Sequence, residues 1–65
     1  MKIIINKLDH DLQKGATLAD VVEVLKLAPP FAAAVNMQFV PKSRYALTEL
    51  KADDDVEIIR PVTGG

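Results

Sequence analysis

The apolar residues of this chain form runs near its two ends and a helical spacing between them. An isoleucine run over residues 3–5, bounded by Asn6, predicts a strand. Residues 9–13 predict a weaker second strand, which the turn signal Lys14-Gly15 ends. Near the C-terminus, the run Val-Glu-Ile-Ile at 56–59 predicts another strong strand. The sequence therefore begins and ends in extended structure.

A helix is predicted to begin after the first two strands. Thr17 offers a hydroxyl for an N-cap, and Asp20 follows three residues later, as the acidic partner does in a capping box. The spacing i, i+3, i+4, i+7 places four apolar residues on one helical face: Leu18, Val21, Val22 and Leu25. Because Pro29-Pro30 cannot extend a helix, we expect it to end at residue 27 or 28.

A hairpin is predicted after the two prolines. The alanine-rich segment 32–36 predicts a strand, and a tight turn at Met37-Gln38 leads into a return strand at Phe39-Val40. Pro41 ends this return strand because it has no N–H to donate to a sheet.

A connecting segment leads from the hairpin to the last strand. It predicts one helical turn over 42–45, an extended piece over 47–50 and a polar turn at 53–55. The three aspartates of that turn lack the alternating ligands and distal glutamate of a calcium-binding loop, so we expect a solvated turn.

Together these elements predict an α+β fold. One helix covers a face of a mixed sheet of four or five strands, and the first and last strands lie side by side and parallel at its centre. We expect a single domain over residues 1–60 and a flexible C-terminal tail over 61–65, because Pro61 cannot donate to a sheet.

Composition narrows the classes of protein. The 65 residues carry eight Lys and Arg against nine Asp and Glu, a net charge of −1 that gives no electrostatic footprint for nucleic acid. No cysteine and a single histidine, His10, argue against a metal site, and His10 has no nucleophile partner in a recognisable arrangement. No apolar run approaches the length of a membrane span. We expect a cytoplasmic protein without metal or bound cofactor, monomeric when free.

The C-terminal sequence Thr63-Gly64-Gly65 holds the most informative chemistry. Glycine lacks Cβ, so a Gly-Gly end can thread a narrow channel and present its carboxylate to a partner. This pattern favours a protein that is a substrate of another enzyme, although composition alone allows a terminus without a role.

The predicted fold with a Gly-Gly end resembles the ubiquitin-like sulfur carriers, most closely the ThiS family of thiamine biosynthesis. The resemblance spans essentially the whole chain and rests on Gly15-Ala16-Thr17-Leu18, Val35-Asn36, Val40-Pro41, Ser43, Tyr45-Ala46 and residues 56–65. It departs at Asp53-Asp54, where the family often has Gly-Asp; aspartate also tolerates left-handed geometry. The resemblance implies a ubiquitin-like β-grasp fold.

The resemblance also implies a protein cosubstrate without catalytic residues of its own. A ThiF-like, E1-like adenylyltransferase would use ATP to adenylate the Gly65 carboxylate, and sulfur from a persulfide donor protein would replace AMP. The resulting thiocarboxylate would donate sulfur to a ThiG-like thiazole synthase. Gly64, Thr63 and Val62 would give the tail access to these partners.

Four residues are candidates for the partner interface: Ala32, Ala33, Ala34 and Arg60. Small side chains permit close approach, and Arg60 can pair with a carboxylate near the partner's channel. Phe39 fits either this surface or the core. Three other functions stay open: a MoaD-like small subunit of molybdopterin synthase, a ubiquitin-like modifier joined to lysine, and a plain interaction domain.

Overall fold

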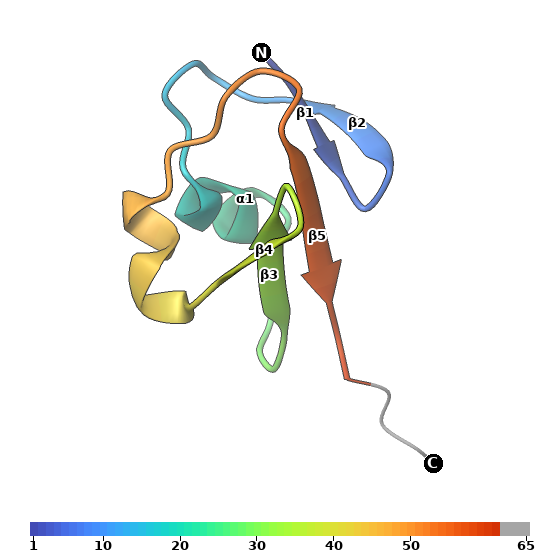
Figure 1. Ribbon diagram of the computed structural model, residues 1–65, viewed down its shortest axis with the longest axis vertical. Coiled ribbons are helices and arrows are strands. Elements are labelled where there is room, and N and C mark those ends of the chain that lie inside the picture. The colour runs from blue at the N-terminus through green and yellow to red at the C-terminus, as the bar shows by residue number, and fades with distance from the viewer. Residues whose placement is uncertain (62–65) are drawn as a thin grey trace.

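A computed structural model describes residues 1–61 of the chain, and Figure 1 shows its elements in order. These are β1 (Lys2–Ile5), β2 (Leu8–Asp11), α1 (Leu18–Val24), β3 (Ala32–Val35), β4 (Gln38–Val40), the 3-10 helix η1 (Lys42–Leu47) and β5 (Asp55–Ile59). The predicted α+β fold is confirmed, with five strands in one sheet.

The last strand lies at the centre of the sheet. The strand order is β2-β1-β5-β3-β4, so β5 separates the two hairpins. It is parallel to β1, through Ile4 opposite Asp55 and Ile5 opposite Val56, and antiparallel to β3. The prediction that the first and last strands are parallel neighbours is therefore confirmed.

Two-residue turns of the same geometry close both hairpins. Asn6 and Lys7 have φ angles of 49° and 69°, and Asn36 and Met37 have φ angles of 50° and 69°. Positive φ at both positions is the requirement of a type I′ turn, and asparagine is among the residues that tolerate it best. The turn predicted at Met37-Gln38 is wrong by one residue, because Asn36 takes the first left-handed position.

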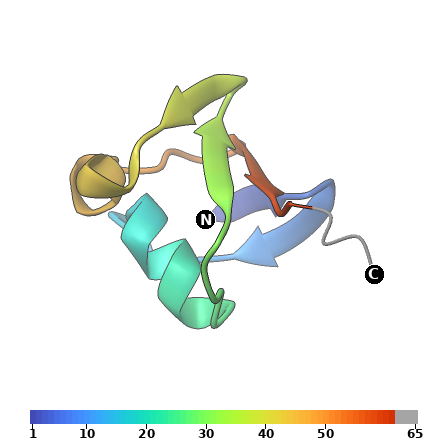
Figure 2. The same ribbon diagram turned by 90° about the horizontal axis from the view of Figure 1, so that it is seen from below.

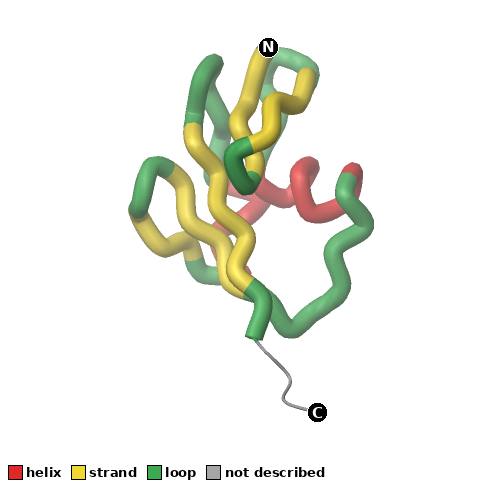
Figure 3. The backbone as a smooth tube through the Cα atoms, turned by 90° about the vertical axis from the view of Figure 1, so that its right-hand side faces the viewer, coloured by secondary structure: helices red, strands yellow, loops and turns green. Residues whose placement is uncertain are grey.

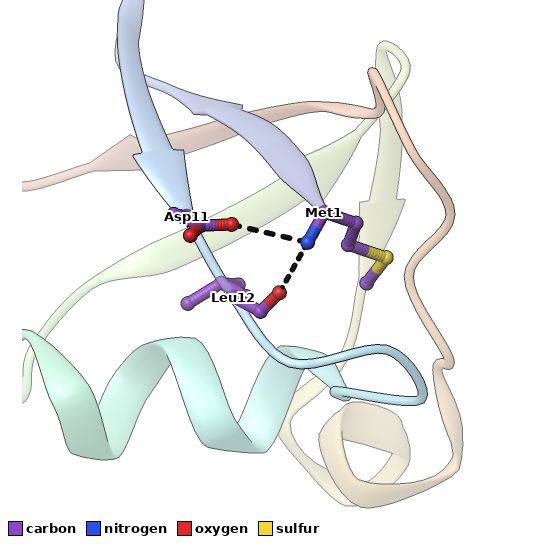
Figure 4. Close-up of polar contacts among 3 residues, drawn as sticks. All are labelled: Met1, Asp11 and Leu12. Atoms are coloured by element: carbon purple, nitrogen blue, oxygen red, sulfur yellow. Dashed lines mark hydrogen bonds and ion pairs between the residues drawn. The ribbon is translucent and has the colours of Figure 1, made fainter.

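Strand β2 ends at Asp11, earlier than the predicted segment 9–13. The Met1 ammonium donates to Asp11 Oδ1 at 3.1 Å and to the Leu12 carbonyl at 2.6 Å, which holds the chain where it leaves the strand (Figure 4). Leu12 then packs half-buried against the core. The predicted turn after it is confirmed, with Gly15 at a φ of 89°.

The predicted capping box starts helix α1. The Asp20 N–H donates to Thr17 Oγ1 at 3.4 Å, and the Thr17 N–H donates to Asp20 Oδ2 at 2.8 Å. Both bonds satisfy backbone donors that a helix start leaves without an internal partner.

Helix α1 ends at Val24, before the predicted residue 27 or 28. Lys26 adopts a left-handed φ of 52°, and its N–H donates to the Glu23 carbonyl. The Leu27 N–H donates back to the Val22 carbonyl at 3.0 Å. These two bonds form a Schellman motif, which ends the helix before the prolines are reached.

The segment after β4 folds as η1, two residues longer than the helical turn predicted over 42–45. Leu47 therefore belongs to this helix, and the expected extended piece begins only after it. Tyr45 is buried, and its ring stacks on Phe31 with centroids 6.0 Å apart.

The core lies between the sheet and the helices. Figures 2 and 3 show α1 and η1 on one side of the strands. Ten buried residues form a single cluster there: Ile3, Ile5, Leu18, Val21, Ala33, Val40, Tyr45, Leu50, Val56 and Ile58. The predicted apolar face of α1 is confirmed, since Leu18 and Val21 are fully buried in this cluster. Neither helical segment of residues 1–61 is long and apolar enough to cross a membrane.

Candidate functional site

The last strand leads directly to the sequence-predicted reactive end. Beyond β5, Arg60 and Pro61 are exposed and continue past the end of this central strand (Figure 1). The predicted site residues Val62, Thr63, Gly64 and Gly65 lie outside the described residues, and so does the predicted tail apart from Pro61. The described part of the site is therefore the end of β5 and the sheet surface beside it.

The sheet face away from the helices carries an apolar surface. Successive residues of a strand point to opposite faces, so Ala32 and Ala34 lie opposite to the buried Ala33. Phe39 pairs with Ala34, and Ile59 pairs with Ala32. We call these four residues, Ala32, Ala34, Phe39 and Ile59, the outer patch.

The outer patch has both exposed and half-buried members. Phe39 is 70% exposed and Ile59 is 52% exposed, while the two alanines between them are half-buried. Small residues flanked by large apolar ones make a surface that another protein can approach closely. Ile59 is also the last residue of β5, which makes the patch continuous with the exit of the chain.

The prediction that Ala33 belongs to the partner interface is wrong. Its side chain is fully buried, and it lies in register with Ile58 on one side and Val40 on the other, both of them core residues. Strand alternation explains the difference, because only every second residue of an alanine run can face outward. Ala32 and Ala34 remain candidates, and Arg60 is exposed beside Ile59.

Charged residues border the outer patch along β5. Glu57 lies opposite Ala34, and with Asp55 and Lys7 it lines a hollow between the two hairpin turns. Met37, 93% exposed, also lines this hollow. The border can therefore offer charge pairs around an apolar centre, as protein interfaces commonly do.

The acidic turn before β5 has a structural role. Asp53 has a φ of 70°, the left-handed geometry that the sequence allowed at this position. The Asp54 carboxylate accepts hydrogen bonds from Asn36 Nδ2 at 3.0 Å and from the Lys51 N–H at 2.8 Å. Within residues 1–61, no three His, Cys, Asp or Glu side chains are grouped as metal ligands.

Sequence reasoning left the place of Phe39 open and did not single out Ile59. The signal for Phe39 was the asparagine at position 36, which fixes the turn and so places Phe39 opposite Ala34. A local signal for Ile59 is the charged Glu57 two residues earlier, because residues i and i+2 of a strand share one face. In the structure Ile59 is exposed on the outer face opposite Ala32, and Ile58 is buried opposite Ala33.

The chain is similar to known proteins in sequence and in fold. A sequence model described as the ThiS family matches residues 3–65. A crystal structure described as thiamine biosynthesis protein (ThiS) from Geobacter metallireducens is similar, with a TM-score of 0.84 at 19% identity over 100% of both chains. An NMR solution structure of a thiamine biosynthesis protein from the same organism gives a TM-score of 0.81 at 20% identity, over 100% of this chain and 88% of that one. No curated protein matches. These likenesses confirm the predicted β-grasp fold.

Proposed function

The chain belongs to the ThiS family, and on that basis we propose that it is a sulfur carrier protein for the thiazole moiety of thiamine. The observation that carries this proposal is the family match, which extends over residues 3–65 and so includes the terminal Gly64-Gly65. The central strand that leads to this end, with an apolar face beside its exit, supports the same function.

The proposed reacting group is the Gly65 carboxylate. A carboxylate resists nucleophilic attack because its charge is delocalised and its leaving group would be oxide. A ThiF-like adenylyltransferase removes this obstacle by joining the carboxylate to AMP from ATP, with release of pyrophosphate. The chain contributes the acyl group and an unhindered approach, since neither Gly64 nor Gly65 has a side chain.

Sulfur enters at the activated carbonyl. The terminal sulfur of a partner persulfide attacks the carbonyl carbon, and AMP leaves with the bonding electron pair. A thiol then cleaves the sulfur–sulfur bond, which releases a thiocarboxylate on Gly65 and leaves a disulfide on the partner. The chain has no cysteine, so its own residues supply no thiol for either step.

The outer patch is the proposed docking face for the adenylyltransferase. It combines the aromatic ring of Phe39 with Ile59 at the chain exit, and aromatic residues are enriched at the centres of protein interfaces. Arg60 lies between this patch and the tail and can pair with a carboxylate at the entrance of the partner's channel. The ThiG-like thiazole synthase, which takes the sulfur, would engage the same end.

We expect the thiocarboxylate to appear in intact-mass spectra. Protein incubated with ATP, the host's ThiF-like enzyme and a persulfide source should gain the mass of one oxygen-to-sulfur exchange. Omission of ATP is the control, because activation must precede sulfur transfer. High-mass lysine conjugates would favour a modifier instead, and an unchanged mass under all conditions would contradict the sulfur carrier.

A separate experiment distinguishes thiamine from molybdopterin as the product that receives the sulfur. Loss of the protein should create a need for thiamine, whereas loss of molybdoenzyme activity would favour the MoaD-like alternative.

Replacement of Phe39 by serine is expected to weaken docking with little loss of stability. Truncation of an aromatic interface anchor raises the dissociation constant about 30-fold or more, at 2 kcal/mol for a typical hot spot. Leu47→Ser is the matched control, because Leu47 is 71% exposed but lies on η1, on the helical side of the sheet. Isothermal titration with the ThiF-like enzyme measures both. Equal affinities of the two variants would show that the outer patch does not dock this partner.

A further inference from the structure

The central strand is held on both sides in its first half and on one side in its second half. Its pairing with β1 stops at Ile5 opposite Val56, whereas its pairing with β3 continues to Ala32 opposite Ile59. The chain of β1 turns away at Asn6. The last residues of β5, which lead to the reactive end, therefore lack a neighbouring strand on the β1 side.

The side chain of Asn6 takes the place of the missing strand. The Asn6 N–H donates to the Val56 carbonyl at 2.9 Å, the last backbone bond between the two segments. Asn6 Oδ1 then accepts a hydrogen bond from the Ile58 N–H at 2.8 Å, in partly buried surroundings. An amide oxygen thus supplies the acceptor that a further β1 residue would otherwise provide, and the ladder gains one rung.

Asn36 does the same at the opposite end of β5. It occupies the same position of an equivalent turn, and its Oδ1 accepts a hydrogen bond from the Asp55 N–H at 3.0 Å. The two asparagines therefore have equal backbone geometry and each caps one N–H of β5. They differ in place, since Asp55 begins the strand and Ile58 lies three residues before Pro61.

We propose that Asn6 is a positioning residue for activation of the C-terminus. By fixing the Ile58 peptide, it sets the direction in which Ile59, Arg60 and Pro61 leave the sheet, and so reduces the ordering that binding to the adenylyltransferase requires. The role rests on the proposed function. The physical effect is preorganisation: a segment that is already held in the conformation it has when bound loses less conformational entropy on association.

The test compares Asn6→Gly with Asn36→Gly. Glycine accepts the left-handed backbone at both positions, so each variant keeps its turn and loses one side-chain hydrogen bond to β5. Asn36→Gly also loses the hydrogen bond from Asn36 Nδ2 to Asp54, so it is the more severe change of the two. With the host's ThiF-like enzyme and ATP, pyrophosphate release should show KM raised about 3- to 10-fold for Asn6→Gly, the effect of one hydrogen bond, with kcat unchanged. Asn36→Gly should keep the KM of the unaltered chain.

A readout in the free protein separates this role from general destabilisation. Amide hydrogen exchange followed by NMR should be faster at Ile58 in Asn6→Gly and faster at Asp55 in Asn36→Gly. Asn6→Asp keeps an acceptor oxygen and tolerates the same backbone, so it should preserve both Ile58 protection and KM. If Asn6→Gly does not fold, the KM and the Ile58 protection of Asn6→Asp test the proposal instead.

Two results overturn the proposal. One is an equal KM for both glycine variants, and the other is a raised KM for Asn6→Asp while its Ile58 amide stays protected. Pyrophosphate release with the unaltered chain distinguishes failure of the proposed role of Asn6 from failure of the proposed function. If the enzyme releases no pyrophosphate with the unaltered chain, the sulfur-carrier function itself is overturned, and the role of Asn6 falls with it.

Discussion

Amidation of the Gly65 carboxylate is expected to abolish adenylation. An amide has no anionic oxygen to attack the α-phosphate of ATP, so the acyl adenylate cannot form. The sequence contains no cysteine, so no thiol of these 65 residues can hold the sulfur in place of the C-terminus. Pyrophosphate release should therefore fall to the background of the enzyme alone, and the thiocarboxylate should be absent from intact-mass spectra. The expected loss is complete, rather than a change in KM.

The control for this experiment is a chain of identical sequence made by the same semisynthesis with a free carboxylate. Both products should unfold at the same temperature, because the change lies beyond the described domain. A chain extended by one residue after Gly65 should behave like the amide, since its new carboxylate no longer follows Gly-Gly directly. Full activity of either altered chain would mean that the C-terminal carboxylate is not the reacting group.

Replacement of Ala33 by aspartate is expected to unfold the domain. Ala33 is fully buried between Val40 and Ile58. A lone buried charge without a partner costs about 3–5 kcal/mol. At 0.05–0.15 kcal/mol per residue, a domain of this size has a free energy of unfolding of only about 3–10 kcal/mol. Circular dichroism should show a large population of unfolded chain at neutral pH and a strongly lowered midpoint of thermal unfolding.

Ala32→Asp is the matched control, because it makes the same change at the neighbouring residue. Ala32 lies on the outer face opposite Ile59, where water can solvate a carboxylate. We expect a midpoint of unfolding near that of the unaltered chain, together with weaker docking of the adenylyltransferase. A native-like Ala33→Asp variant would contradict the assignment of Ala33 to the core and would restore it as an interface candidate.

Local sequence signals predicted the elements well where one residue type decides the geometry. The capping box at Thr17 and Asp20 fixed the start of α1, and the isoleucine run gave β1. The end of α1 was harder, because its signal is a left-handed lysine. Lys26 carries the Schellman motif in place of the usual glycine, so the first stop signal that the sequence itself shows is the pair of prolines.

The candidate site likewise has one part that the sequence reveals and one part that it does not. The terminal Gly64-Gly65 is visible in the printed sequence, whereas the docking surface depends on which residues of each strand face outward. For this reason the sequence does not separate the buried Ala33 from its outward-facing neighbours, and it does not place Phe39. The role of Asn6 was invisible, because its hydrogen bond joins residues 52 positions apart.

The amino-acid order by itself determined the helix and strands of an α+β domain, the cap of its helix and a C-terminal Gly-Gly without side chains. These features depend on propensity, spacing and composition, which act over a few residues. Only the tertiary structure decided that Ala33 is core while Ala32 and Ala34 face outward, and that the Asn6 amide holds the last strand where it leaves the sheet. The physical reason is that strand register and side-chain bonds between distant segments are set by packing of the whole domain.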